Sequence, residues 1–596
     1  MIIFMEDYND LFRMRHTAQH VLAYAMEILF PGVKKAMGPA TADGFYGDFE
    51  LPEGVAVSLD DFQKIEDKMK EIINSGKDMI YQEVSLAEAK KLFQDNIYKL
   101  EWIQEIDARG EKISLYWIGD ENVDLCAGPH VGNVKDVKAF KLLNIAGAYW
   151  RGDSKNKMLT RIYGTAYPSE KALKEYLHNR EEAEKRDHRK LGPALDLIYF
   201  DNKSPGAPYW LPKGLIIYKE LYNFWSYYHE DHGYLEYRGP LVNRKELFEI
   251  SGHWDHYKEH MFILNQDKHN ILVIKPMGCP NALVAFNLQT RSYQDLPYRL
   301  ADVDMLYRHE DAGALAGLFR TYEFNQDDAH IFISEDQIES EYNNIIDIVE
   351  DFYNLFELQC SFQLSTRPDD FMGEVETWNR AEIILKDILT KRFGQDGFTI
   401  KEKDGAFYGP KLDIHMKDCL GREWQMGTIQ LDFQLPGRFN SHYIDENGNR
   451  QTPILLHRVI YGAIGRFIAI LIEHFSGKFP VWLSPVHAVI IPISDAYSAY
   501  ADKIYQVLHD VEIRTATRGL RITKDYSSDR FQKRIRNAQV QYIPYMLIVG
   551  ENEKNNNTVS VRTRDGQQLN NIPLENFIEI LKNKIRSKSL EIKLDA

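Results

Sequence analysis

The chain has 596 residues, a length that predicts three to five domains at about 100–200 residues each. Its composition, 44% hydrophobic and 27% charged, is typical of a globular protein, and no apolar run reaches the roughly 18 residues that a membrane-spanning helix needs. Disordered, fibrous and membrane-spanning proteins are therefore excluded, and the net charge of −16 argues against a surface that binds nucleic acid everywhere.

The charge is unevenly distributed along the chain. From residue 485 onward there are 17 Lys and Arg against 13 Asp and Glu, a net charge of +4, which leaves −20 for the rest. This asymmetry favours contact between the last segment and a polyanion, although a chance excess of solvated lysines explains it equally well. The cysteines are too few for a disulfide framework and the first residues do not resemble a signal peptide, so we expect a cytoplasmic protein with no membrane partner. They are Cys126, Cys279, Cys360 and Cys419.

An apolar helix is predicted over residues 15–30, with two histidines four residues apart on one face. Much later in the chain, a cysteine and a histidine repeat this spacing beside an aspartate. Together the motifs predict a four-ligand metal site or a hydrolytic site, whereas a histidine pair alone more often lies on a helix surface. The residues are His16, His20, Asp124, Cys126 and His130.

A charged segment over 169–191 has helical periodicity and is predicted to connect two domains. The region after it mixes strands with long helices, which indicates an antiparallel sheet covered by helices. The predicted strands are 269–276, 329–334 and 423–433, and the predicted helices are 338–358, 374–394 and 458–475. The last segment alternates strands, among them 486–493 and 511–518, with helices, as in a layered β/α domain.

A second group of polar residues lies in the middle region. Cys279 follows an apolar strand, and a later strand ends in Asp328-Ala-His330, where period two places Asp328 and His330 on one face. A buried Asp or Arg needs a partner of opposite charge, and a metal ion or a phosphate group would supply one for this group. Each residue taken singly fits a surface ion pair as well. Between them come Arg308, Glu310, Arg320, Phe324 and Gln326.

A third group follows at His457, in an apolar segment that contains Arg466. An unpaired arginine in such a segment is costly, so an anionic partner such as phosphate is expected. Gly462 and Gly465 would allow a planar ligand to approach the backbone.

These motifs, in this order, resemble the class II aminoacyl-tRNA synthetases, and among them the threonyl-tRNA synthetases, over nearly the whole chain. Pro240 in the segment EYRGPLVNRKELFE resembles the first class II motif, Arg308 to Phe324 the second, and Gly462 to Arg466 the third. The stretch 147–168, together with the His16/His20 pair and the Cys126/His130 pair, resembles the editing domain of that family.

The resemblance implies an α+β multidomain fold with a class II antiparallel-sheet catalytic domain, an N-terminal α+β editing domain and a C-terminal α/β anticodon-binding domain. The implied boundaries are 1–168 for editing, 169–190 for a linker helix, 191–483 for catalysis and 484–596 for anticodon binding. The implied activity is activation of L-threonine with ATP, transfer to the 3′ end of tRNA(Thr) and hydrolysis of mischarged seryl-tRNA(Thr). Implied partners are tRNA(Thr), ATP with Mg²⁺, and a second copy of the chain in a homodimer.

The resemblance also implies roles for individual residues. One Zn²⁺ per catalytic domain would be held by Cys279, His330 and His457. ATP would be bound by Arg308, Glu310, Arg320, Phe324, Lys411, Gln425 and Arg466, of which Arg308, Lys411 and Arg466 would act in catalysis. Threonine would be bound by Met277, Gln326, Asp328, Tyr408 and Gln430, editing would use His16, His20, Lys99, Asp124, Cys126 and His130, and Glu553 and Arg562 would read the anticodon.

Whether the editing residues hold a metal stays open, with a metal-free pocket favoured. Departures from the family pattern are Ala282, Tyr322 and Ser528, together with the position of His16, which implies a form without the leading ubiquitin-like domain. Two alternatives remain: a catalytically altered synthetase-like protein that binds RNA or regulates, and a metal-dependent hydrolase that uses the N-terminal His/Cys site.

Overall fold

The computed structural model describes residues 9–267, 270–418 and 421–594, so Cys419 lies outside the described residues. The chain divides into two compact units, Met1–Glu181 and Glu182–Ala596. Within the described ranges, no helix combines the length and apolar character needed to cross a bilayer.

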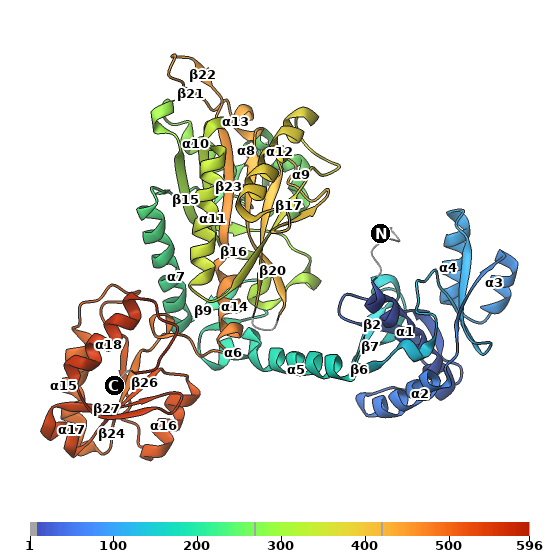
Figure 1. The fold of residues 1–596 in the computed structure, drawn as a ribbon, viewed down its shortest axis with the longest axis horizontal. Coiled ribbons are helices and arrows are strands. Elements are labelled where there is room, and N and C mark those ends of the chain that lie inside the picture. The colour runs from blue at the N-terminus through green and yellow to red at the C-terminus, as the bar shows by residue number, and fades with distance from the viewer. Residues whose placement is uncertain (1–8, 268–269, 419–420, 595–596) are drawn as a thin grey trace. The chain divides into compact units, whose positions relative to one another are not determined.

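The first unit is built around helix α1 (Figure 1). Asn9 caps this helix by accepting a hydrogen bond from the backbone N–H of Phe12. Ala18, Val21 and Leu22 are fully buried in a core shared with helix α2 and with a four-stranded antiparallel sheet of order β1-β2-β7-β6. The elements are α1 (Asp10–Leu29), β1 (Lys34–Met37), β2 (Phe45–Glu50), α2 (Phe62–Ser75), β6 (Ala139–Tyr149) and β7 (Met158–Tyr167).

A smaller antiparallel sheet of order β3-β4-β5 completes this unit. Ile103 and Leu115 form part of a separate small core between the sheet and helices α3 and α4. The chain leaves β5 directly into the loop that carries Cys126 and His130. The elements are β3 (Met79–Val84), α3 (Leu86–Leu92), α4 (Ile97–Ala108), β4 (Ile113–Ile118) and β5 (Asn122–Leu125).

The connecting helix predicted over 169–191 is interrupted. Helix α5 (Glu170–Arg186) ends, and α6 (His188–Ala194) begins with Asp187 as its N-cap, whose side chain accepts a hydrogen bond from the backbone N–H of Arg189 at 2.8 Å. A side chain that competes for backbone donors in this way starts a new helix.

An eight-stranded sheet forms the centre of the second unit, in the order β10-β15-β16-β23-β20-β19-β17-β18. It is antiparallel except at its two edges, where β10 pairs with β15 and β18 with β17 in parallel. The strands are β10 (Leu235–Glu236), β15 (Tyr298–Tyr307), β16 (Glu323–Ile333), β17 (Gln359–Ser365), β18 (Thr399–Lys401), β19 (Lys411–Lys417), β20 (Glu423–Asp432) and β23 (Ile454–Ala463).

Long helices cover one face of this sheet. Ala329 and Ile331 of β16 pack in the same core as Ile345 of α11 and Phe467 of α14, so the even-numbered residues of β16 point to the opposite face. The helices are α7 (Pro212–Asp231), α11 (Ile338–Asn354), α12 (Val375–Phe393) and α14 (Ile464–His474). The predicted antiparallel sheet with covering helices is confirmed.

Smaller elements complete this unit. They are β8 (Ile198–Phe200), β9 (Pro208–Trp210), β11 (Val242–Arg244), α8 (Lys245–Ser251), α9 (His253–Tyr257), β12 (Ile263–Asp267), β13 (Asn270–Ile274), α10 (Cys279–Phe286), β14 (Arg291–Ser292), α13 (Leu435–Arg438), β21 (Tyr443–Ile444) and β22 (Arg450–Gln451). Helix α10 begins at Cys279.

The helix predicted over 458–475 is wrong in its first part. Residues up to Ala463 belong to strand β23, which lies between β16 and β20, and only α14 is helical. Nine of the ten residues of β23 are buried, so the strand is buried on both faces. An apolar run of this kind has no period of two and resembles a buried helix.

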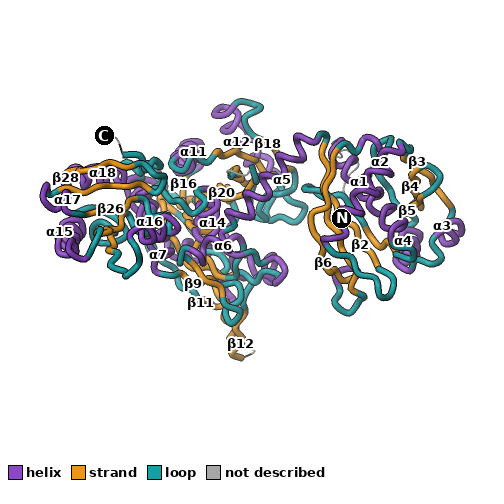
Figure 2. The backbone as a smooth tube through the Cα atoms, turned by 90° about the horizontal axis from the view of Figure 1, so that it is seen from below, coloured by secondary structure: helices purple, strands orange, loops and turns teal. Residues whose placement is uncertain are grey.

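The C-terminal domain has a five-stranded sheet of order β25-β24-β26-β27-β28 between helices (Figure 2). Ile535 of α16 packs on one face, and Phe577 of α18 on the other. The strand predicted over 511–518 is wrong: this segment is irregular, and β25 takes the edge position after it. The elements are β24 (Ala488–Pro492), α15 (Ser498–His509), β25 (Ile522–Lys524), α16 (Phe531–Val540), β26 (Tyr545–Val549), α17 (Glu551–Asn556), β27 (Thr558–Thr563), β28 (Gln568–Pro573) and α18 (Leu574–Arg586).

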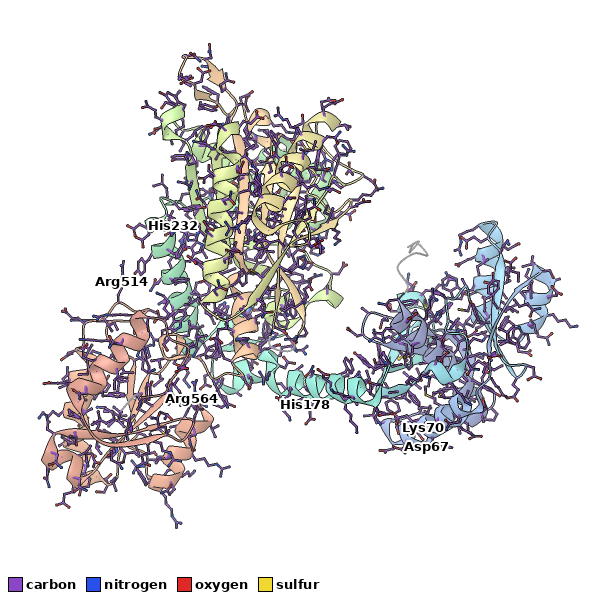
Figure 3. All side chains as sticks on the ribbon, in the orientation of Figure 1. Asp67, Lys70, His178, His232, Arg514 and Arg564 are labelled. Carbon is purple, nitrogen blue, oxygen red and sulfur yellow. The ribbon has the colours of Figure 1, made fainter. Side chains whose placement is uncertain are left out.

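Arg564, labelled in Figure 3, ties this domain to the segment that precedes it. Its guanidinium group donates to the carbonyl oxygens of Lys478 and Phe479, each at 2.7 Å. Both acceptors lie shortly after α14 in the chain. These hydrogen bonds therefore hold the C-terminal domain next to the end of α14, one of the helices that cover the eight-stranded sheet.

Candidate functional site

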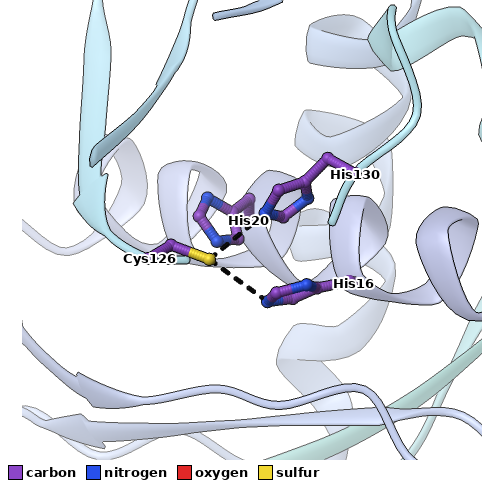
Figure 4. A group of neighbouring side chains, drawn as sticks. All are labelled: His16, His20, Cys126 and His130. Atoms are coloured by element: carbon purple, nitrogen blue, oxygen red, sulfur yellow. Dashed lines mark hydrogen bonds between the residues drawn. The ribbon is translucent and has the colours of Figure 1, made fainter. Parts of the chain in front are cut away.

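Four side chains of the first unit converge at one point (Figure 4). Helix α1 supplies His16 and His20, and the loop after β5 supplies Cys126 and His130. The Cys126 Sγ lies 3.5 Å from His16 Nε2 and 3.3 Å from His130 Nε2, and the rings of His16 and His130 stack at 4.1 Å. Their potential ligand atoms all lie within 4.8 Å of one another. The structure therefore brings together the two motifs that the sequence separates by more than a hundred residues.

Burial keeps this cluster uncharged. It lowers the pKa of His16 to about 4 and those of His20 and His130 well below the usual value, because imidazolium is poorly solvated there. Burial also raises the pKa of the Cys126 thiol to about 12. The neutral side chains could orient a water molecule, or could exchange the thiol proton for a metal ion.

Lys99 and Asp124 form a buried ion pair beside the cluster, with Nζ 2.6 Å from Oδ1. Burial alone would raise the pKa of Asp124, but Lys99 and Lys35 outweigh it and the pKa is lowered. A pocket of about 330 Å³ opens next to this pair, lined by Met37, Pro39, Lys99, Trp102, Arg109, Lys112, Ser114 and Cys126 among others. Of the six predicted editing residues, Lys99 and Cys126 line this pocket, Asp124 pairs with Lys99, and the three histidines cluster with Cys126.

A second cluster lies in the large sheet. His330 of β16 and His457 of β23 are directly opposite each other in the strand register, and Cys279 stands at the start of α10. All three side chains are buried and their potential ligand atoms lie within 4.8 Å of one another. Burial lowers the pKa of His330 and raises that of the Cys279 thiol.

The donor set fits a zinc ion. Among the described residues, neither ring nitrogen of His330 has a hydrogen-bond partner although both are buried, and a metal ion would satisfy one of them. His457 Nε2 lies 3.0 Å from Asp432 Oδ2 on β20, so its other ring nitrogen is left for the metal. One thiolate and two imidazoles are ligands that Zn²⁺ prefers, and three protein ligands leave a position for a substrate.

A pocket of about 870 Å³ adjoins this cluster. Every residue that the sequence predicts for ATP lines it, and so do four of the five predicted for threonine. The predicted lining residues are Met277, Arg308, Glu310, Arg320, Phe324, Gln326, Tyr408, Lys411, Gln425, Gln430 and Arg466. Asp328 is not among the lining residues; its carboxylate lies 3.9 Å from Nε2 of His330 in the second cluster.

Three arginines line this pocket, together with Lys411 and the carboxylates of Glu310, Asp404 and Glu423. The guanidinium group of Arg308 lies 5.0 Å from the centre of the Phe324 ring, and Arg320 is 3.8 Å from Glu310. Arg466 donates from Nε to the carbonyl oxygen of Phe319 at 2.8 Å. Burial, then repulsion from Arg320 and Arg308, lowers the pKa of Arg466, so a bound polyanion would relieve an unfavourable cluster of positive charge.

The opposite wall of the pocket is held by side-chain hydrogen bonds. Lys411 lies 3.0 Å from Asp413, and the Gln425 amide donates to the same carboxylate at 2.6 Å. The Tyr408 hydroxyl donates to Gln430 Oε1. These polar groups are therefore oriented by their neighbours and not by a ligand.

Asp328 is buried beside other charged groups. Burial raises its pKa to about 6, against the opposing effects of His457, Arg458 and Arg308. Asp302, on the adjacent strand β15, faces Asp328 in the register and has a pKa raised by burial and by Asp328. A cationic or hydroxyl-bearing ligand would offset the cost of these neighbouring acids.

Sequence reasoning missed His253. This buried residue at the start of α9 has Nε2 3.6 Å from Cys279 Sγ and Nδ1 2.8 Å from the Ser251 hydroxyl. Its only signal was the local segment SGHWDHY, which contains a second histidine that points to Asp370 instead. Local sequence does not distinguish the two histidines, because only the fold brings His253 next to Cys279.

The predicted anticodon residues are partly occupied inside the domain. Glu553 is buried on α17, where its carboxylate accepts hydrogen bonds from the N–H of Gly550 at 2.9 Å and from the Ser560 hydroxyl at 2.6 Å. Arg562 is half-buried on β27, and Ser528 is exposed. Of the other departures, Ala282 is fully buried within α10, and Tyr322 donates its backbone N–H to Gly206.

Comparison with protein families gives three matches. Residues 262–475 match the tRNA synthetase class II core domain (G, H, P, S and T), and residues 487–584 match an anticodon binding domain. Residues 113–163 match the threonyl and alanyl tRNA synthetase second additional domain.

Individual relatives match over almost the whole chain. The chain is 46% identical to the threonine–tRNA ligase of Caldanaerobacter subterraneus subsp. tengcongensis, over 96% of this chain and 87% of the relative. It is also 46% identical to that of Carboxydothermus hydrogenoformans, over 97% of this chain and 89% of the relative. A crystal structure described as the RNA binding domain of threonyl-tRNA synthetase from Cryptosporidium parvum Iowa II covers 69% of this chain and 99% of its own, at 38% identity and a TM-score of 0.63.

Proposed function

The chain belongs to the family of threonine–tRNA ligases, and from this premise we propose how its residues divide the work. It carries the class II core, the anticodon-binding domain and the editing domain, so it is an aminoacyl-tRNA ligase whose activity is to attach threonine to tRNA and to edit the product. The alternatives of a regulatory RNA-binding protein and of a metal-dependent hydrolase are not favoured by these matches.

The observation that carries the assignment is the position of the two arginines and the metal cluster around one pocket. Arg308 and Arg466 lie on the wall of the 870 Å³ pocket, and Cys279, His330 and His457 adjoin it. One end of the pocket thus suits a polyphosphate and the other a small amino acid with metal-binding groups.

ATP is proposed to bind with its adenine between Phe324 and Arg320 and its phosphates against Arg308 and Arg466. Arg308 would stabilise the negative charge that develops on the α-phosphate when the amino acid carboxylate attacks. Arg466 would hold the γ-phosphate, and Glu310, Lys411 and Gln425 would complete the site. Mg²⁺ would accompany the phosphates, as is usual for nucleotides.

Threonine is proposed to bind beside Asp328, which would accept the hydrogen bond of its hydroxyl group. Zn²⁺ held by Cys279, His330 and His457 would supply Lewis-acid binding for an amine and a hydroxyl group. Met277, Gln326, Tyr408 and Gln430 would fix the remaining orientation of the amino acid.

This arrangement explains why an editing site accompanies the synthetic one. Valine lacks the hydroxyl, so Asp328 would be left without its partner, a mismatch that discriminates by about 10⁴–10⁵. Serine keeps the hydroxyl and lacks one methyl group, which gives only about 10–200-fold discrimination. Hydrolysis of seryl-tRNA is therefore required for accuracy.

Editing is proposed at His16, His20, Cys126 and His130, with Lys99 and Asp124 beside them. The buried ion pair of Lys99 and Asp124 would keep an ammonium group near the ester carbonyl, where negative charge develops during hydrolysis. The neutral imidazoles would orient the attacking water. Zinc analysis of the purified protein is expected to give one zinc per chain, and two would show that the editing cluster also binds metal.

The domain division is proposed as 1–168, 169–190, 191–483 and 484–596. It is supported by the three family matches and by the split into two compact units near residue 181. We also propose a homodimer through the segment around Pro240. Arg562 is proposed to read the tRNA(Thr) anticodon, and Glu553 is proposed to support it by holding the start of α17 through its hydrogen bonds to Gly550 and Ser560.

The decisive experiment is ATP–pyrophosphate exchange with threonine, serine, valine and proline in a zinc-replete preparation. We expect rapid exchange with threonine, weaker exchange with serine and almost none with the other two. Absence of threonine-dependent exchange would contradict the proposal.

A further inference from the structure

His188 stands where three parts of the second unit meet. It opens helix α6, which lies beside α14 (Figure 1), and its side chain is fully buried. Its Nδ1 is 2.7 Å from Glu473 Oε1 on α14, and its Nε2 is 3.0 Å from the backbone nitrogen of Leu318. One imidazole therefore joins α6, α14 and the loop between β15 and β16.

These contacts define the protonation of the ring. A backbone N–H can only donate, so Nε2 of His188 is an acceptor and the proton resides on Nδ1, which donates to Glu473. Asp187, His188 and Glu473 offer ligand atoms within 4.8 Å of one another. Both nitrogens of His188 nevertheless have partners within the protein, so the group is a hydrogen-bond network and not a cation site.

The loop is shaped to receive this ring. Gly317 has φ of +54°, and a Cβ atom there would collide with His188 Nε2 and crowd Arg189. Only glycine combines the left-handed backbone with this close approach. The Phe319 ring then packs edge-on against His188 at 4.4 Å and lies 4.3 Å from the Trp424 ring.

The same loop residues line the ATP pocket. Leu318 and Phe319 form part of its wall, and the Phe319 carbonyl oxygen is the acceptor for Arg466 Nε at 2.8 Å. A continuous series of contacts thus runs from the His188 ring through residues 317–319 to the guanidinium group of Arg466. Glu473 closes the series, because it lies on the same helix as Arg466.

We propose that His188 is a positioning residue for ATP: it holds residues 317–319 so that the Phe319 carbonyl orients Arg466. The inference rests on the proposed function, which assigns Arg466 to ATP. It adds that the first turn of α6 supports the ATP site from outside, because His188 itself does not line the pocket. Loss of the bond to Leu318 would let the loop relax and would weaken ATP binding, while the threonine subsite would stay intact.

Two substitutions separate the two bonds of the ring. In His188→Asn the side-chain amide can still donate to Glu473 but cannot reach Leu318, whereas in His188→Gln the carbonyl oxygen can still accept from Leu318. We expect the KM for ATP in pyrophosphate exchange to rise about tenfold in His188→Asn, the effect of one lost hydrogen bond to a buried donor, and to stay within about threefold in His188→Gln. The KM for threonine should not change in either variant.

A glycine pair tests the loop side of the contact. Gly317→Ala should reproduce the rise in the KM for ATP. Gly437→Ala should leave it unchanged, because a Cβ at Gly437 of α13 meets open space and this residue does not line the pocket. Hydrolysis of seryl-tRNA by the same preparations should equal that of the wild type, which checks the first unit.

The Arg466→Ala variant distinguishes a failure of the positioning role of His188 from a failure of the proposed ATP site. If Arg466→Ala raises the KM for ATP but His188→Asn and His188→Gln behave alike, or the KM for threonine rises in parallel, the positioning role is wrong. If Arg466→Ala leaves the KM for ATP unchanged, the assignment of the ATP site itself fails.

Discussion

Asp328 shows how a single residue is expected to set specificity. Its buried carboxylate lies next to His330, where a hydroxyl group of the substrate would replace solvent as its partner. Asp328→Asn removes the charge and keeps the volume. We expect the kcat/KM for threonine to fall by about 10–100-fold, the value of one charged hydrogen bond, and that for valine to change little. Pyrophosphate exchange with both amino acids measures the ratio of the two kcat/KM values, which should decrease in the variant. An equal loss of kcat/KM for both amino acids would contradict the role of Asp328.

The buried histidines of the first unit predict a dependence on pH. The pKa of His16 falls to about 4 in the folded chain from 6.5, and those of His20 and His130 also fall. Between these values the unfolded chain binds protons that the folded chain does not, so stability is full above pH 6.5 and decreases as the pH falls toward 4.

We therefore expect the melting temperature of the first unit, in metal-free buffer, to be lower at pH 5 than at pH 7.5. His16→Gln should reduce this difference, because it removes one of the titrating groups. A melting temperature that is equal at both pH values would show that the cluster is not buried as described.

At the residue scale, the sequence predicted the positions of side chains that follow the alternation of a strand. Asp328 and His330 could be placed on one face because they are two residues apart in a strand, and the structure confirms this geometry. His253 could not be found, because nothing in its neighbourhood indicates which of two nearby histidines turns inward. Contacts that depend on distant segments leave no local signal.

At the scale of elements, strand β16 is joined to β23 by a buried carboxylate. Asp327 accepts hydrogen bonds from the backbone N–H groups of Ile460, Tyr461 and Gly462 at 3.0–3.2 Å, at the point where the register between the strands shifts. These donors belong to the segment that leads into α14 and Arg466. Asp327 thus fixes where the third motif begins.

Asp327→Asn should destabilise this junction, because the amide NH₂ group would face backbone donors. We expect the free energy of unfolding of the second unit to fall by about 1–3 kcal/mol, the cost of unsatisfied buried donors. Asp369→Asn is the matched control: Asp369 is exposed and forms an ion pair with the exposed Lys403, so a change below about 0.5 kcal/mol is expected. Urea unfolding of both variants measures the difference, and equal effects would refute the role of Asp327.

The elements themselves were predicted unevenly. Helices α11 and α12 have amphipathic periodicity and were predicted within a few residues of their observed ends. Strand β23 was assigned to a helix because burial on both faces removes its alternation, and the segment 511–518 was assigned to a strand that tertiary pairing places at β25 instead. Periodicity is informative only where one face of an element meets solvent.

At the scale of the whole molecule, the two compact units should perform their reactions independently. Arg308 and His20 belong to different units, and each unit has its own core. We expect Arg308→Ala to abolish threonine activation and to leave hydrolysis of seryl-tRNA intact. We expect His20→Ala to do the reverse, so that seryl-tRNA accumulates while threonine is still charged.

Both variants should be assayed for both reactions, with pyrophosphate exchange for activation and deacylation of preformed seryl-tRNA for editing. If Arg308→Ala slowed deacylation, the units would not be independent. If His20→Ala cleared seryl-tRNA at the rate of the wild type, the editing residues would be wrongly assigned.

Strand β16 sets the spacing between the proposed contacts of the site. Phe324, Gln326, Asp328 and His330 follow one another at every second position, so the proposed base, amino acid and metal contacts are spaced along about 20 Å of a single strand. Inserting or deleting one residue would turn all the later contacts to the helix-covered face at once. Single substitutions can therefore alter the specificity of the site, whereas an insertion or deletion of one residue in this strand would disrupt several contacts together.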